Sequence, residues 1–219
     1  MKKTQVPVVV VVTLAMVLMG QLSFAKEKRI AVGVRAVYNS YQGGDIDLFM
    51  DSDADYDNVI GVCADIAYFF TQSISLELGV GRQETTMKVA DFFGAGDYGD
   101  LTQIPVLLTG RYHFAPADKT KIYVGLGIGY YLNDMTRADG AGDYFDGAPP
   151  GVKAFADDAV GYHLNAGMVC FLSEHVALNV DLKYAMLDAD IGFNGAGYDV
   201  KDATILTTFA TGIGVKYYF

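Results

Sequence analysis

Eight segments of the chain alternate between apolar residues and small or polar ones, and this period of two is the feature that most limits the fold. In the first segment Ile30, Val32 and Val34 share one face of an extended strand, while Gly33 and Arg35 share the other. A helix would repeat its apolar positions every three or four residues, so the pattern predicts strands. The apolar faces of the other segments fall within residues 60–68, 74–80, 104–114, 122–132, 162–172, 176–186 and 205–219.

The alternation fits two kinds of protein. A secreted soluble sandwich would bury the apolar faces, whereas a membrane barrel would turn them toward lipid. The segments have about the 9–11 residues with which a tilted strand crosses a bilayer. Their connections alternate in length, as in outer-membrane barrels: residues 70–73, 115–120 and 173–175 are short, and residues 39–57, 84–100, 133–160 and 188–203 are long. We therefore predict an all-β fold, a transmembrane eight-stranded antiparallel up-and-down β-barrel.

Aromatic residues on the apolar faces support this choice. They gather at the ends of the predicted strands, where Tyr side chains sit at the level of lipid head groups. One girdle would lie at the long connections and the other at the short turns, which we expect to face the periplasm. The two girdles are Tyr38, Tyr130, Tyr162 and Tyr184, and Tyr68, Tyr112, Phe114, Tyr217 and Phe219.

The beginning of the chain has the pattern of an export signal. Lys2 and Lys3 precede an apolar run at residues 8–19, which is shorter than the roughly 20 residues of a membrane-spanning helix. Ser23 and Ala25 are small residues at the positions that a signal peptidase recognises. We predict that residues 1–25 are a cleaved signal peptide. Residues 26–219 would then form the barrel domain, in the outer membrane of a bacterial cell.

The charge of the chain argues against nucleic acid as a partner. The formal net charge is −10, whereas nucleic-acid binding needs a basic surface. The four long connections hold 20 of the 26 acidic residues and only four basic residues, so their net charge is −16. We expect an acidic outer rim that contacts outer-membrane lipid and lipopolysaccharide through divalent cations.

The first long connection contains a run of alternating acidic residues that resembles part of a calcium loop. An EF-hand loop needs Gly at its sixth position and Glu at its twelfth. Counted from the first Asp of the run, those positions are Tyr56 and Val62, so the EF-hand is excluded. Loose divalent-cation binding and a solvated acidic loop remain the alternatives, and we predict no cofactor. The run consists of Asp51, Asp53, Asp55 and Asp57.

The inward faces of the predicted strands carry both signs of charge. An eight-stranded barrel is just wide enough for side chains to fill, and a buried unpaired charge is costly. The near-balance of charges therefore predicts ion pairing. The pairs would either plug the barrel without any flux or line and gate a narrow path. The candidate lining residues are Arg35, Asp65, Glu77, Leu107, Arg111, His113, His163, Asp181, Lys183 and Lys216.

Pro105 lies near the outer end of the fourth predicted strand. Proline has no backbone N–H and cannot donate a hydrogen bond to a neighbouring strand. The residue predicts either a local bulge or a weakened seam, through which an apolar ligand could leave the barrel sideways into lipid.

Three stretches carry a resemblance to a known family. LTQIPVLLTGRYHF followed by KIYVGLGIGYYLND resembles the central hairpin region of the OmpW family, and GYHLNAGMVCFLSEHVALNVDLKYAMLDADI is similar to that family's sixth and seventh strands. The terminal TGIGVKYYF looks like the carboxy-terminal signal that the outer-membrane assembly machinery recognises. Its alternating apolar residues are Val215, Tyr217 and Phe219.

The resemblance implies an eight-stranded barrel that lets small hydrophobic molecules pass without energy input. The chain lacks Trp, which the OmpW family tends to use at strand ends, so a generic small barrel of the OmpX or OmpA type is the alternative. Such a barrel would be structural or would interact with surfaces, with a closed polar interior and no flux. No His is followed two residues later by Ser, as it is in the lipid A deacylases, and we predict no enzymatic activity.

Overall fold

A computed structural model describes residues 29–42, 45–46, 52–91, 94–117, 119–137, 153–195 and 198–219. The predicted signal peptide lies outside these residues. Eight long strands form the wall of a barrel: β1 (Ile30–Gln42), β4 (Val59–Phe69), β5 (Ile74–Asp91), β6 (Gly94–Ala117), β7 (Thr120–Arg137), β9 (Ala159–Phe171), β10 (Val176–Gly195) and β11 (Tyr198–Tyr218). Three short strands extend this wall: β2 (Asp45–Ile46) pairs with β3 (Ser52–Tyr56), β3 pairs with β5, and β8 (Lys153–Ala156) pairs with β10.

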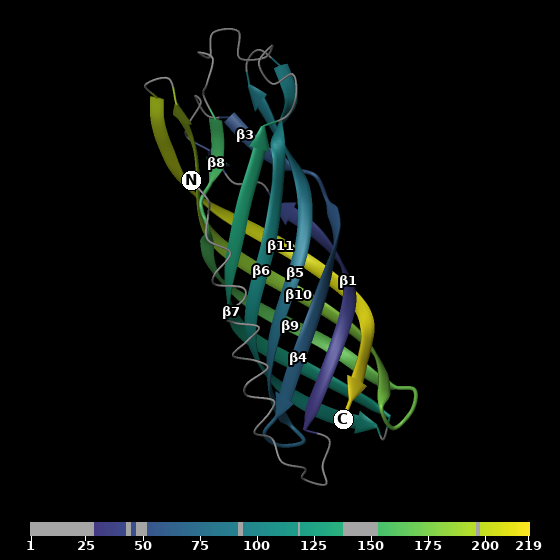
Figure 1. Cartoon of the computed structure of the whole chain (residues 1–219). Helices are drawn as coiled ribbons and strands as arrows, with labels where there is room; N and C mark the ends of the chain where they lie inside the picture. The colour runs from purple at the N-terminus through teal and green to yellow at the C-terminus, as the bar shows by residue number, and fades with distance from the viewer. Residues whose placement is uncertain are drawn as a thin grey trace.

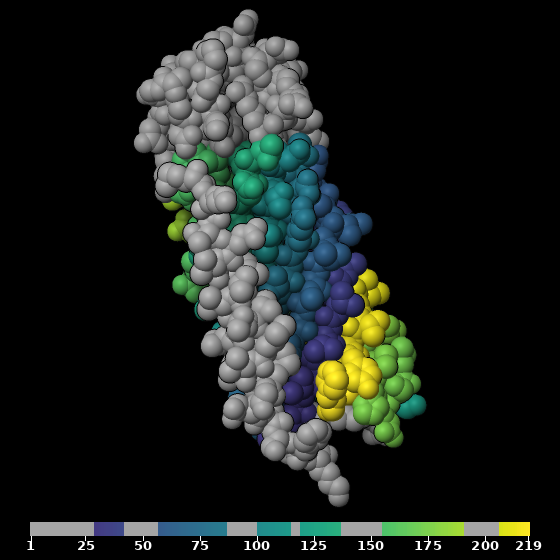
Figure 2. Space-filling model, in the orientation of Figure 1, coloured from purple at the N-terminus to yellow at the C-terminus, as the bar shows by residue number. Residues whose placement is uncertain are grey.

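Each long strand pairs antiparallel with the next one along the chain, and the last strand returns to the first. In the closing pair Val34 lies opposite Val215 and Ala36 lies opposite Ile213. Figure 1 shows β1 in purple beside β11 in yellow, and Figure 2 shows the same two segments in contact. Closure leaves no strand edge unpaired in the wall, as a bilayer requires. The prediction of a closed eight-stranded antiparallel barrel is confirmed.

The alternation of the sequence becomes an inside and an outside. Outward-facing apolar side chains are open to the surroundings: Ile60 is 73% exposed, Leu126 is 69% exposed and Ile213 is 63% exposed. Their inward neighbours include charged residues such as Glu77, which is 1% exposed. In water so wide an apolar surface would be a liability, whereas lipid solvates it. Within the described ranges, no helix has the length and hydropathy needed to span a membrane.

Two of the predicted long connections are mostly strand, which corrects the sequence-based boundaries. Pairing between β5 and β6 continues through residues 83–91 and 94–103, and pairing between β10 and β11 continues to Gly195 and Tyr198. These extensions lack the apolar alternation because they run beyond the apolar belt of the wall. Their backbone groups still pair, so the strands exceed the expected length.

The interior is divided into three levels. The loop end is the end of the barrel opposite the short turns at residues 70–73 and 172–175, and the turn end carries those turns. The outer cluster is an apolar group toward the loop end, made of Tyr41, Leu101, Leu107, Tyr131, Ala156, Ala159, Ala185, Leu187, Ala189 and Leu206. The turn-side cluster is Ala31, Ala67, Phe69, Tyr123, Val169, Ala177 and Tyr218. Buried charges lie between the two clusters.

Candidate functional site: the barrel interior

Glu77 is the centre of the buried charges. Its Oε1 accepts a hydrogen bond from Arg35 Nη2 at 2.9 Å, and its Oε2 accepts one from Arg111 Nη1 at 2.5 Å. Lys216 donates to the same carboxylate. Three cations therefore share one carboxylate that is almost fully removed from solvent. Charge-assisted hydrogen bonds of this kind are among the stronger polar contacts in proteins.

Asp65 and Asp181 extend this network in two directions. Lys216 Nζ lies 2.6 Å from Asp65 Oδ1, and Arg35 Nη2 lies 3.5 Å from Asp65 Oδ2. On the other side, Arg111 Nη2 lies 3.4 Å from Asp181 Oδ2. We call the six charged residues the ion layer: Arg35, Asp65, Glu77, Arg111, Asp181 and Lys216.

The ion layer obstructs the axis of the barrel. Its members come from β1, β4, β5, β6, β10 and β11, so they reach inward from most of the wall. All six are buried, with exposed fractions of 7% or less. A small barrel has little interior space to spare, and here the space is filled by paired side chains. A straight polar path from end to end is therefore closed in this structure.

Neutral polar side chains add hydrogen bonds to the ion layer at Asp181. Tyr123 donates its hydroxyl to Asp181 Oδ2 at 2.6 Å, and Asn165 Nδ2 donates to the same oxygen at 2.9 Å. Asn179 Nδ2 donates to the Tyr123 hydroxyl at 3.0 Å. These three residues are not among the predicted lining residues. Their inward parity was visible in the alternation, but which partner each would meet depends on the stagger of strands far apart in the sequence.

The two interior histidines bond to hydroxyl groups and not to the carboxylates. His113 Nε2 lies 2.8 Å from Ser75 Oγ, and His163 Nε2 lies 2.8 Å from Thr109 Oγ1. The ring of His113 also packs against Phe69, with 5.1 Å between centroids. No group of three His, Cys, Asp or Glu side chains in the described part of the chain is arranged to hold a metal ion. Each histidine is thus bonded through Nε2, and its Nδ1 has no hydrogen-bond partner.

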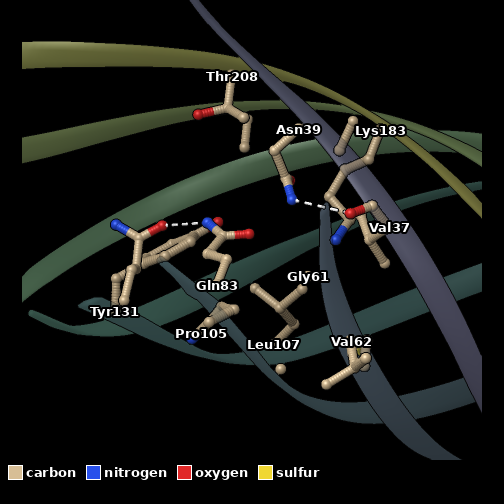
Figure 3. A pocket seen from close by; sticks show the side chains of 15 residues that line it. Val37, Asn39, Gly61, Val62, Gln83, Pro105, Leu107, Tyr131, Lys183 and Thr208 are labelled. Carbon is tan, nitrogen blue, oxygen red and sulfur yellow. Dashed lines mark hydrogen bonds between the residues drawn. The ribbon is translucent and has the colours of Figure 1, made fainter. Parts of the chain in front are cut away.

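A cavity lies between the ion layer and the loop end. Its volume is about 30 Å³, which is room for about two water molecules. Apolar side chains such as Leu107 and Tyr131 line it together with Lys183. Figure 3 shows Lys183 and Asn39 on the side of the cavity opposite Pro105 and Leu107. The lining also includes Val62, whose side chain faces outward and is 61% exposed. The cavity therefore reaches the wall itself at β4.

The same cavity borders an interruption in the wall. The ladder between β5 and β6 contains the pairs Val80–Val106 and Gln83–Gln103, but the two intervening positions, which include Gly81 and Pro105, are unpaired. The register is the same on both sides, so this is a gap without a bulge. Pro105 has no N–H to donate, and its ring stands 3.1 Å from the position that a Cβ on Gly81 would occupy. The prediction of a local bulge at Pro105 is therefore wrong. Pro105 also lies in the middle of β6, not near its end, because the strand extends toward the loops.

The other predicted site residues have less to contribute. The side chains of Asp51, Asp53 and Asp55 lie outside the described residues, and Asp57 is exposed at the start of a link between β3 and β4. Val215 and Tyr217 face outward on β11. Phe219 donates its backbone N–H to Ile30 O at 2.9 Å, which ties the final residue to the first strand.

The sequence profile of the OmpW family matches residues 28–219. Among curated relatives, an uncharacterized outer-membrane protein, y4mB of Sinorhizobium fredii, is 30% identical over 147 residues, which are 67% of this chain. The match spans 60% of that relative, less than two thirds of its length. The outer membrane protein AlkL of Ectopseudomonas oleovorans is 24% identical over 84% of this chain and 78% of its own.

The fold has solved counterparts as well. The crystal structure of the outer membrane protein OprG from Pseudomonas aeruginosa superposes with a TM-score of 0.68 at 20% identity, covering 87% of this chain and 94% of that one. The barrel geometry and the family profile agree with each other, and the named relatives are outer-membrane proteins. This chain is an outer-membrane β-barrel protein, and it belongs to the OmpW family.

Proposed function

We propose that the barrel is a narrow conduit for the passive passage of small hydrophobic molecules, with a lateral exit beside Pro105. A solute enters at the loop end, where the outer cluster offers apolar contacts. The ion layer stops it from continuing along the axis, because desolvated charges bind apolar groups poorly. It then leaves through the gap between β5 and β6 into the bilayer.

The observation that carries this proposal is the lining of the cavity. The inward-facing Leu107, the positions Gly81 and Pro105 that do not pair with each other, and Val62 of the neighbouring strand all border one space. A path from interior to lipid needs such a junction. The two missing pairs between β5 and β6 weaken the wall only locally, because the strands pair regularly on both sides of them. The cavity is too small for a solute, so passage requires the side chains around it to move.

The physical benefit of such a conduit lies in the lipopolysaccharide layer. An apolar solute dissolves readily in hydrocarbon, but a charged carbohydrate surface excludes it. A barrel that receives the solute above that layer and releases it below the head groups removes this barrier. Transport of this kind needs no open aqueous pore.

The test is uptake of an apolar fluorescent dye by cells whose outer membrane carries lipopolysaccharide. Cells that produce the barrel should take up the dye faster than cells that lack it. Pro105→Ala restores a backbone donor and should slow uptake without lowering the amount of folded barrel. Val106→Ala changes the next residue, whose pair with Val80 is intact, and serves as the control. Equal uptake by wild type and Pro105→Ala would contradict the lateral exit.

A second candidate is a structural barrel whose acidic connections bind lipopolysaccharide through divalent cations. The filled ion layer favours it, because the layer would stabilise a barrel that conducts nothing. Protease digestion of intact cells with and without a chelator tests this role. A structural barrel should become more sensitive to protease when the cations are removed, and dye uptake should not depend on it. Recognition of the terminal strand by the assembly machinery remains a further proposal, testable by deleting Phe219 and measuring the yield of inserted barrel.

A further inference from the structure

Lys183 differs from the other cations in the middle of the barrel. Arg35, Arg111 and Lys216 each contact at least one carboxylate of the ion layer. With Lys183 included, four cations face three carboxylates, so one positive charge is left over. No hydrogen bond or ion pair within 4.0 Å joins Lys183 to another residue of the described chain, and Asp181 is the carboxylate whose field reaches it. Its position on β10 is one inward step from Asp181 toward the loop end.

The side chain of Lys183 lines the cavity beside the gap in the wall. The amide donors around that cavity are already used. Gln83 Nε2 donates to Tyr41 and to Gln103 Oε1, and Asn39 Nδ2 donates to a backbone oxygen, Val37 O. The Lys183 ammonium has three N–H donors and no partner for them within the described residues. It is the cationic group that a ligand in the cavity would meet.

Arg35 strengthens the positive character of the same region. Its guanidinium lies 3.8 Å from the Sγ of Cys63, a residue that lines the cavity. Its Nη1 is buried and has no hydrogen-bond partner. Two donors on neighbouring cations thus lack acceptors next to one space. Arg35 has counter-charges in Asp65 and Glu77, whereas the partly buried Lys183 has none, and an anionic group in the cavity would supply one.

We propose that this cavity binds the anionic head group of a small single-chain amphiphile, such as a medium-chain carboxylate. The cavity holds a head group and no more, since its volume is about 30 Å³. Leu107 and Tyr131 provide apolar surface inside the cavity for the chain that follows, and Val62 provides it on the outer face of the same wall. This inference rests on the proposed conduit and names its substrate class: amphiphilic anions are held in preference to neutral or cationic molecules of the same chain length.

Binding is the first measurement. The refolded mature barrel in nanodiscs of zwitterionic phosphatidylcholine is dialysed against labelled octanoate, 1-octanol or octylamine at pH 8, and empty nanodiscs provide the background. Octanoate is fully ionised there. The barrel should bind octanoate more tightly than either of the other two. Equal affinities for octanoate and octanol would overturn the proposal.

Variants assign the preference to Lys183. Lys183→Met keeps the length of the side chain and removes its charge. It should weaken octanoate binding about tenfold, the loss expected for one charge-assisted hydrogen bond. Octanol binding should not change. Lys183→Arg should retain the preference. Lys119→Met, at an exposed turn, is the matched control and should behave as wild type. Undiminished octanoate binding by Lys183→Met would contradict the assignment.

A further arm separates solutes from membrane lipids, which also carry anionic heads. Nanodiscs are prepared with increasing phosphatidylglycerol. If the affinity for octanoate does not depend on phosphatidylglycerol, the cavity is a site for diffusing solutes. If phosphatidylglycerol displaces octanoate, the cavity binds membrane lipid, and the proposal of a solute site is overturned. The proposed conduit fails separately: absent dye uptake with intact, Lys183-dependent octanoate binding rejects the conduit and keeps the site.

Discussion

The ion layer and the cavity next to it are adjacent and built differently. In the ion layer every carboxylate contacts at least one cation, and Glu77 contacts three. In the cavity a lysine has no partner, amides bond to one another, and the neighbouring wall lacks two backbone pairs. The first region is held by a network of ion pairs, although Arg35 Nη1, Asp65 Oδ2 and Arg111 Nε have no hydrogen-bond partner of their own. The second holds a lysine that no carboxylate pairs with, and an anionic ligand would supply that partner.

Removing one paired cation should have the largest effect on stability. Lys216→Met leaves Asp65 and Glu77 short of a partner, and we expect the free energy of unfolding to fall by about 3–5 kcal/mol. Urea unfolding in lipid vesicles, followed by far-ultraviolet circular dichroism, measures this. Glu84→Gln removes an exposed pair with Arg82 at 3.7 Å and should change stability by less than about 1 kcal/mol. Equal effects of the two variants would mean that the ion layer is not rigidly bonded.

A smaller loss should follow from crowding the ion layer. A Cβ on Gly167 would collide with the Tyr123 hydroxyl and with Val180 O. Gly167→Ala must therefore move the hydroxyl that bonds Asp181, and we expect a loss of about 1–3 kcal/mol in the same unfolding experiment. Gly110→Ala is the control, since the nearest atom to its Cβ would be Leu126 O at 3.9 Å. No difference between these variants would contradict the tight packing of this level.

The smallest expected change has the opposite sign. Lys183→Met replaces an unpaired charge with an apolar side chain of similar length, so the free energy of unfolding should rise by about 1 kcal/mol. The same substitution at Lys216 is expected to destabilise, which makes the two lysines a direct comparison between the regions. Destabilisation by Lys183→Met would show that this lysine has a structural partner after all.

The alternation of the sequence was sufficient for the wall of the barrel and for the face on which each residue lies. Ile60 and Glu77 were assigned to opposite sides of the wall by parity alone, and the barrel has them so. The partners inside could not be derived this way. Lys216 meets Asp65 across 151 positions of sequence, and the stagger of eight strands decides that contact.

Two other features were beyond the sequence for different reasons. The strand extensions near Met87 and Asp199 carry no apolar alternation, so a pattern based on lipid contact ends before the hydrogen bonding does. The sequence at Pro105 predicted a missing backbone donor. It did not predict where the proline lies in the strand, or that the register continues without a bulge. The lone charge of Lys183 became visible only when the three carboxylates had been matched to their cations.

The closing pair of strands also has a kinetic consequence. Ala31 lies opposite Tyr218, so the closing contact of the wall joins the first strand of the barrel to the last. Contacts between such distant positions form slowly, because a long loop must be ordered before any of them contributes. Until β11 meets β1, both strands present unpaired edges and a wide apolar surface to water. We therefore expect the unclosed chain to be the state most exposed to aggregation, and a longer lifetime of that state to lower the yield of folded protein.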